Sequence, residues 1–213
     1  MVEAALDMQG ESSRVERRRN KRVATILKVA GETLAEVGYH NLSLERVADA
    51  LDLSKTSLYH YFPSKDALID AAIDHMASEV HDRLAQLTDP RLGDAVARLR
   101  SLIAEQLTIV LCEYPEATRL FTQSADWPLA HVQKVKTIRR DHYDIFKSVV
   151  LEGVEDGTLH PVSVEAALHC MHGAINDAGV WSRSLTPAEM SERIEELTDT
   201  VMMLFGRSGP DSS

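Results

Sequence analysis

Residues 42–65 read LSLERVADALDLSKTSLYHYFPSK, and this stretch decides how the N-terminal part of the chain folds. Ser43 and Ser54 are good N-caps for two short helices, because a serine side chain accepts a hydrogen bond from a free backbone N–H group in the first turn. Apolar residues repeat at helical spacing along the first helix: Leu44, Val47, Ala48 and Leu51. Asp52 lies in the turn, where a left-handed residue is expected, and Pro63 ends the second helix. The stretch therefore predicts a helix-turn-helix.

The second predicted helix carries hydroxyls, aromatic tips and lysines where an amphipathic helix normally shows plain charge. These side chains face outward or sideways once Leu58 and Phe62 face inward. When a helix-turn-helix binds DNA, its second helix enters the major groove, and side chains of this kind reach base edges and phosphates. The predicted DNA-binding residues are Ser43, Lys55, Thr56, Ser57, Tyr59, His60, Tyr61 and Lys65. The alternative is that these residues form an ordinary solvated surface.

The same stretch resembles the DNA-binding domain of the TetR family of bacterial transcriptional repressors. The resemblance covers about residues 20–70 and is carried by Gly38, Tyr39, Ser43, Val47, Ala48, Leu53, Ser54, Leu58, Tyr59, Tyr61, Phe62, Ser64, Lys65 and Leu68. The family usually has a glycine where this chain has Asp52, and often a small residue where it has Thr56. The resemblance implies that Tyr61 and Lys65 contact DNA phosphates. It also implies that two protomers associate through the last two helices of each.

The charge of the chain is unevenly distributed. The net charge is −10, from 23 basic and 33 acidic residues. Residues 1–66 hold 10 basic and 10 acidic residues, which leaves 13 and 23 for the rest of the chain. Seven of the basic residues fall within residues 14–28, against a single acid, Glu16. A local basic patch attracts DNA phosphates, while an acidic remainder keeps the body away from the duplex.

Two cysteines, Cys112 and Cys170, are too few for a disulfide framework and suit a reducing cytoplasm. The chain has no apolar run of signal-peptide length and none of the roughly 18 residues that a membrane-spanning helix needs. We therefore expect a soluble, cytoplasmic protein that has no membrane partner and needs no cofactor.

The pattern along the chain predicts an all-α fold of about nine helices. We expect an N-terminal three-helix DNA-binding domain and a C-terminal helical domain for effector binding and dimerisation. The expected parts are a disordered basic arm over residues 1–18, the helix-turn-helix domain over 19–66, the helical domain over 67–206 and a disordered tail over 207–213. Further expected helices run over about 21–37, 65–88, 92–113, 115–124, 129–156, 161–184 and 187–205. The arm either reaches DNA phosphates or the minor groove, or acts as a solubilising tail.

The helix expected over residues 161–184 has a face of small residues, which allows another helix to approach closely. With the apolar stripe of the last helix, it forms the predicted dimer interface: Ala166, Cys170, Gly173, Ala174, Asp177, Ile194, Leu197 and Val201. The alternative is that this face packs against the body of its own chain. A homodimer fits a DNA-binding protein, because the two-fold axis of the protein then matches a palindromic operator.

Residues 139–189 loosely resemble the C-terminal half of family members that sense acyl-CoA or related lipid-catabolic thioesters. Together with bulky residues near the helix ends, this gives the predicted ligand-binding residues Phe121, Trp127, His142, Phe146, Asn176 and Trp181. Such bulky residues are more often core than ligand contacts. A multidrug sensor of an efflux gene is the alternative effector class.

Two further classes of function are weaker. His169 and His172 lie three residues apart on one expected helix, but no second pair with metal-ligand spacing accompanies them, so no metal site is expected. No phosphate-binding loop, nucleophile elbow or zinc-binding helix motif indicates an enzyme. The sequence predicts a dimeric repressor that binds a double-stranded DNA operator and is released by a small apolar effector. A non-repressor DNA-binding factor of the same fold is the alternative.

Overall fold

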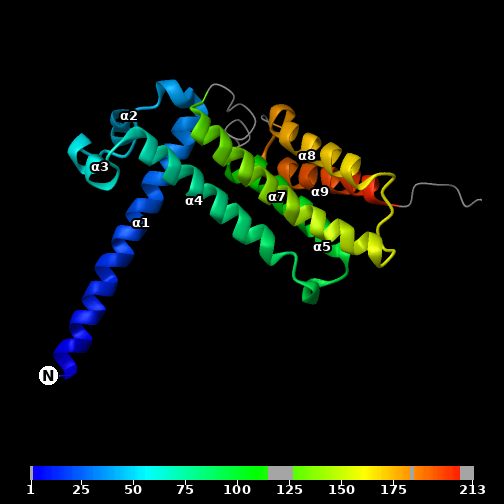
Figure 1. Ribbon diagram of the computed structural model, residues 1–213, viewed down its shortest axis with the longest axis horizontal. Coiled ribbons are helices and arrows are strands. Elements are labelled where there is room, and N and C mark those ends of the chain that lie inside the picture. The colour runs from blue at the N-terminus through cyan, green and yellow to red at the C-terminus, as the bar shows by residue number, and fades with distance from the viewer. Residues whose placement is uncertain (1, 115–126, 183–184, 207–213) are drawn as a thin grey trace, which may run out of the picture. The chain divides into compact units, whose positions relative to one another are not determined.

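The computed structural model describes residues 2–114, 127–182 and 185–206, with only the backbone described for residues 2–15 and Trp181. Within these ranges the chain forms eight α-helices and no strand, which confirms the all-α fold class (Figure 1). The chain divides into two compact units, residues 1–76 and 77–213. The short helix expected over residues 115–124 and the expected tail over 207–213 lie outside the described residues.

The first helix, α1, runs over Val2–Asn41 and is longer than the sequence predicts. The expectation of a disordered arm over residues 1–18 differs from the structure, which describes these residues, from Val2 on, as helical. Residues 2–18 contain no proline, and they include three Glu, three Arg and two Ala, all of which favour helix. Gly38 interrupts α1 with φ 77° and ψ 168°, so the predicted break at this glycine is confirmed.

Helices α2 (Leu44–Ala50) and α3 (Lys55–Tyr61) form the helix-turn-helix. The side chain of Ser43 accepts a hydrogen bond from the backbone N–H of Arg46, and that of Ser54 accepts one from Ser57. Asp52 has a φ of 51°, so the predicted left-handed turn is confirmed. Both helices bury their apolar sides in one core with α1 and the start of α4: Ile26, Leu27, Ala30, Leu44, Val47, Ala48, Leu58, Phe62, Leu68 and Ala72.

Helix α4 spans Lys65–Gln86 and contributes to both units. Leu68 and Ala72 belong to the core of the first unit, whereas Leu84 belongs to the core of the second. The first unit therefore extends to residue 76, past the expected boundary after residue 66. The physical reason is that the N-terminal core is completed by the first turns of this helix.

The second unit is a helical body built from α5 (Ala95–Thr108), α7 (Leu129–Glu155), α8 (Val164–Trp181) and α9 (Pro187–Met202). Helix α5 packs against both α7 and α9, and α7 packs against α8 (Figure 1). A π-helix, Ile109–Glu113, continues α5, and two 3₁₀ turns cover Pro90–Leu92 and Met203–Phe205. The last helix is capped at Thr186, which forms a reciprocal capping box with Glu189.

One buried arginine holds the connection between α4 and α5 against α7. Arg98 is only 2% exposed, and its guanidinium donates to the backbone carbonyls of Thr88 (2.8 Å) and Gly93 (3.1 Å) and forms an ion pair with Glu152. A charge that is buried this deeply is tolerated because the nitrogens of the guanidinium donate to carbonyl and carboxylate oxygens. The end of α4 is thereby fixed in the body.

Candidate functional site

The recognition helix α3 presents the polar surface that its sequence predicts. Leu58 is completely buried, while Lys55, Thr56, Ser57 and His60 are exposed and Tyr59 is 42% exposed. Of the other predicted DNA-binding residues, Tyr61 is half-buried against the core of the first unit, and Ser43 is half-buried as the cap of α2. The free face of α3 is thus formed by its first two turns, the part of a recognition helix that reaches base edges.

An ion pair joins the two helices of the motif. Lys55 at the start of α3 pairs with Glu45 in the first turn of α2, and its Nζ lies 5.7 Å from the centre of the Tyr59 ring. The pair raises the pKa of Lys55 and lowers the pKa of Glu45, since each group stabilises the charged form of the other. Both side chains remain open to solvent, so Lys55 can exchange the carboxylate for a DNA phosphate.

A second polar cluster surrounds the start of α4. Lys65 donates from Nζ to the backbone carbonyl of His40 (3.3 Å), and the same Nζ lies 4.5 Å from the centre of the Tyr39 ring. The Tyr39 hydroxyl donates to Asp66 (2.6 Å), and this hydrogen bond raises the pKa of Tyr39 to about 12. These contacts hold the ammonium of Lys65 next to the end of α1, and the Lys65 residue is half-buried.

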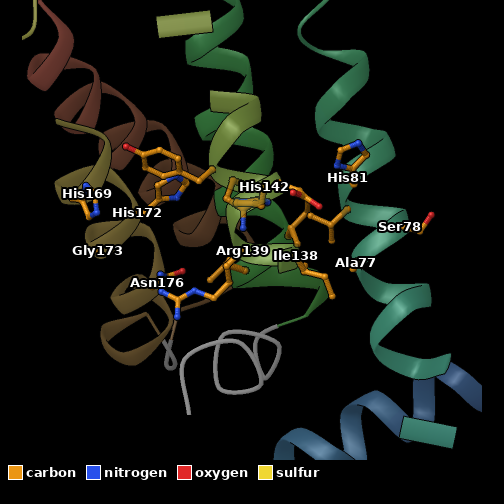
Figure 2. Close-up of a pocket in the computed structure, with 16 residues that line it drawn as sticks. Ala77, Ser78, His81, Ile138, Arg139, His142, His169, His172, Gly173 and Asn176 are labelled. Atoms are coloured by element: carbon orange, nitrogen blue, oxygen red, sulfur yellow. The ribbon is translucent and has the colours of Figure 1, made fainter. Parts of the chain in front are cut away.

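The body contains a cavity of about 620 Å³. Its wall comes from α4, α5, the π-helix, α7 and α8: Ala77, Ser78, Val80, His81, Gln106, Ile109, Val110, Ile138, Arg139, Asp141, His142, Tyr143, His169, His172, Gly173 and Asn176. Figure 2 shows Ser78 and His81 on α4 at one side and His169, His172 and Asn176 on α8 at the other, with His142 between them. This volume lies in the range of sites for drug-sized ligands.

Two neighbouring histidines of the cavity wall are neutral at pH 7. Burial, with a smaller contribution from His81, lowers the pKa of His142 to about 4. Burial also lowers the pKa of His172 to about 3, with further contributions from His142, His169 and Arg139. The ring centres of His142 and His172 lie 5.6 Å apart, and those of Phe146 and His172 lie 5.1 Å apart in a T-shaped arrangement. Neutral imidazoles carry one donor and one acceptor each, so this wall offers directed hydrogen bonds without charge.

The predicted ligand-binding residues divide into two groups. His142 and Asn176 line the cavity, whereas Phe146 and Trp127 are not among its lining residues, so ligand binding by all four stays a prediction. Phe146 is completely buried because it packs behind the histidine rings, and Trp127 is half-buried away from the cavity. Phe121 lies outside the described residues, and the side chain of Trp181 is not described.

Gln106 is one of the cavity residues that the sequence did not single out as ligand-binding. It is 8% exposed and sits on the buried face of α5 beside Ile103 and Leu107. A glutamine next to apolar residues at helical spacing was the available signal, because a buried amide needs a partner.

The predicted dimer face of α8 is largely open. Ala166, Cys170, Gly173 and Asp177 are exposed and Ala174 is half-buried. On α9, Ile194 and Leu197 are half-buried, whereas Val201 is only 4% exposed and belongs to the core of the body, which removes it from the predicted interface. Gly173 also lines the cavity, so the cavity and this face share the middle of α8.

The exposed recognition helix and the cavity in the helical body define a helix-turn-helix transcriptional regulator with a separate sensing part. Residues 26–72 match the family of bacterial regulatory proteins called the tetR family, and residues 92–204 match the tetracyclin repressor-like C-terminal domain. The chain belongs to the TetR family. This family consists of DNA-binding regulators rather than enzymes.

Relatives match the chain over nearly its whole length. It is 27% identical over 206 residues to the HTH-type transcriptional regulator RutR of Escherichia coli (strain K12), covering 95% of this chain and 89% of that protein. A TetR/AcrR family regulator from Thermobifida fusca has a similar structure, with TM-score 0.65 and 25% identity over 88% of this chain and 100% of the other. Bacillus subtilis FadR in complex with stearoyl-CoA has TM-score 0.67 and 17% identity, covering 85% and 98%.

Two structural observations bear on the other classes of function. No helix in residues 2–114, 127–182 and 185–206 is both long and apolar enough to cross a membrane. Among the residues that the structure describes, no three His, Cys, Asp or Glu side chains, His169 and His172 included, gather closely enough to hold a metal ion.

Proposed function

We propose that the protein is a homodimeric repressor that binds a palindromic operator through α3 and leaves it when a small effector occupies the cavity of the body. The observation that carries the proposal is the course of α4. This helix begins at Lys65, next to the recognition helix, and residues 77–81 of the same helix supply part of the cavity wall. An effector that binds better to one position of α4 shifts the population of the dimer toward it.

The proposed effector is an acyl-CoA or a related acyl thioester. The cavity has an apolar lining from Ala77, Val80, Ile109, Val110 and Ile138 that suits an acyl chain. The fold similarity to B. subtilis FadR, which was solved with stearoyl-CoA, and the resemblance of residues 139–189 to acyl-thioester sensors support this class. A cavity of about 620 Å³ accommodates the acyl arm, while the nucleotide part of coenzyme A remains outside.

Two protomers are proposed to associate through α8 and α9. The exposed small side chains of α8 allow close helix approach, and Ile194 and Leu197 add apolar area on α9. In the dimer the two recognition helices then lie about 34 Å apart, or a multiple of that, and face successive major grooves.

A gel-shift titration with the DNA upstream of the gene tests the proposal. Fatty acids, acyl-CoAs, steroids and planar cationic drugs are added to the complex, and melting temperatures are measured in parallel, since a ligand that binds only the folded state raises the melting temperature. We expect acyl-CoAs to stabilise the protein and to weaken operator binding about 5- to 150-fold, the range of typical allosteric coupling. Release by drugs alone indicates a multidrug sensor, and stabilisation without release contradicts the repressor mechanism.

A further inference from the structure

Gln106 belongs to the cavity wall and carries a buried, unsatisfied oxygen. Its side chain is 8% exposed, and Oε1 has no hydrogen-bond partner among the residues that the structure describes. Gln106 lies in the last turn of α5, directly before the π-helix that supplies Ile109 and Val110 to the same wall. A π-helix inside an α-helix often marks a functional position. A buried acceptor without a donor destabilises the empty protein, so it is expected to have a partner in another state.

His172, on the opposite helix α8, has the same property. Its Nε2 is buried and lacks a partner in the described part of the chain. The ring is held by Phe146, His142 and Tyr143, whose centres lie 5.1, 5.6 and 5.5 Å away. Because burial keeps its pKa near 3, the imidazole is neutral and offers one donor and one acceptor. A rigid, neutral ring is suited to orienting a ligand rather than to neutralising a charge.

Part of the cavity wall is apolar. Ala77, Val80, Ile109, Val110 and Ile138 can make only van der Waals contacts with a ligand. The permanently charged side chain of the wall, Arg139, is exposed and shares the wall with the exposed Asp141. A neutral polar group between the two neutral histidines and the amide forms hydrogen bonds without the cost of burying a charge.

We propose that the part of the effector that enters the cavity carries a neutral hydrogen-bonding group, such as a hydroxyl or an amide, which donates to Gln106 Oε1 and pairs with His172 Nε2. This inference rests on the proposed function of the cavity as an effector site. For an acyl thioester, it selects an oxygenated acyl chain or the amides of the pantetheine arm. A plain saturated chain leaves both groups unsatisfied.

A pair of isosteric probes tests this inference without knowledge of the natural effector. The probes are 2-naphthol and 2-methylnaphthalene, which differ by a hydroxyl in place of a methyl, and their dissociation constants are measured on the full-length protein by fluorescence and calorimetry. The ratio of the two constants is compared between the wild type and the variants Gln106→Met and His172→Phe. We expect each variant to lower the preference for 2-naphthol about fivefold, the effect of one hydrogen bond.

The matched control is Gln133→Met, the same exchange at an exposed glutamine of α7 that does not line the cavity. It is expected to keep the wild-type ratio. Melting temperatures of the empty variants report on folding, and Gln106→Met is expected to melt no lower than the wild type because it removes an unsatisfied buried group. A ratio that stays at the wild-type value in both cavity variants overturns the inference.

The gel shift separates this inference from the proposed function. The second pair of probes, hexanoyl-CoA and 3-hydroxyhexanoyl-CoA, is read both by binding and by release of DNA. Suppose that both variants lower the preference for 2-naphthol but that neither thioester releases DNA. In that case acyl-CoA is not the effector, and the recognition of a hydrogen-bonding group by Gln106 and His172 is retained. Suppose instead that hexanoyl-CoA and 3-hydroxyhexanoyl-CoA release DNA equally well, and that neither variant changes the ratio of the two naphthalene dissociation constants. In that case the proposed release by acyl-CoA is retained, and the recognition of a hydrogen-bonding group by Gln106 and His172 is contradicted.

Discussion

Lys55 and Glu45 show how a single ion pair can set the DNA affinity of a recognition helix. Lys55 is placed at the first turn of α3, where base edges and phosphates are reached, yet in the free protein its ammonium is paired with Glu45 of α2. If Lys55 contacts DNA as proposed, DNA binding breaks or shares this pair. Exposed pairs contribute little to stability, so the exchange is easy, but it subtracts from the binding free energy.

We predict that Glu45→Gln strengthens binding to specific and random DNA alike, by roughly two- to fivefold, because Lys55 no longer has to leave a carboxylate. Fluorescence anisotropy at two salt concentrations measures the change. Glu36→Gln, which removes an exposed acid of α1 without touching Lys55, is the matched control. An equal gain in the control would show that only net charge matters.

Lys65 differs from Lys55 in that its ammonium contacts a backbone carbonyl and an aromatic ring instead of a carboxylate. Its contacts with the His40 carbonyl and the Tyr39 ring hold the charge at the start of α4. Such a preorganised charge suits a phosphate contact, since little side-chain freedom is lost on binding.

We predict that Lys65→Ala weakens binding to operator and random DNA by similar factors and flattens the slope of log K against log salt by about one unit. Tyr39→Phe is the companion variant: it removes the hydrogen bond to Asp66 but keeps the ammonium. It should leave the salt slope unchanged. If Lys65→Ala has the wild-type slope, Lys65 does not contact phosphate.

At the scale of elements, the central feature is the fastening of α4 to the rest of the body. Arg83 of α4 donates to Glu105 of α5 (2.7 Å) and to Glu113 of the π-helix (2.9 Å). Close by, the hydroxyl of Tyr114 donates to Glu79 of α4 (3.0 Å). The π-helix thus contacts the cavity through its first residues and α4 through its last.

We predict that Arg83→Met reduces the effect of an effector on operator affinity about two- to fivefold and leaves the affinity for the effector itself within about twofold, because Arg83 lies outside the cavity wall. Calorimetry gives the effector affinity, and anisotropy with and without effector gives the coupling. Full coupling in the variant would assign transmission to other contacts of α4.

The two neutral histidines connect α7 and α8 with the pH dependence of stability. Their pKa values of about 4 and 3 in the folded state lie below the ordinary histidine value near 6.5. The unfolded chain therefore binds more protons than the folded one between about pH 6.5 and pH 4, and stability falls as the pH drops through this window.

We predict that each histidine contributes a loss of up to about 1.4 kcal/mol per pH unit in the free energy of unfolding below pH 6. Denaturant unfolding at several pH values measures this slope. His172→Phe should remove about half of the histidine part of this slope.

At the scale of the whole molecule, the proposed mechanism requires a dimer. We predict that Cys170→Arg, on the exposed small-residue face of α8, yields a folded monomer with strongly reduced operator affinity, because the change buries an unpaired charge only when two protomers meet. Light scattering and circular dichroism measure assembly and folding, and Gln133→Arg on α7 is the control. A stable Cys170→Arg dimer with normal DNA binding would place the interface elsewhere.

Local signals in the sequence determined the helix-turn-helix and most of the helix boundaries. Ser43 and Ser54 cap their helices, Asp52 makes the turn and Gly38 makes the break, and each does so through its own backbone and nearest neighbours. Predictions of this kind succeed because the deciding hydrogen bonds span only a few residues. The N-terminal segment was the exception. Its many charges, without apolar periodicity, favoured disorder, whereas the helix propensity of its residues favoured the helix that the structure has.

Only the tertiary structure decided which side chains share the cavity. Gln106, His142 and His172 come from three helices, and no sequence spacing relates them. Packing also placed Phe146 behind the cavity wall and turned Val201 into the core of the body. The physical reason is that periodicity reveals which face of a helix is buried, but the partner of that face depends on how all the helices pack together.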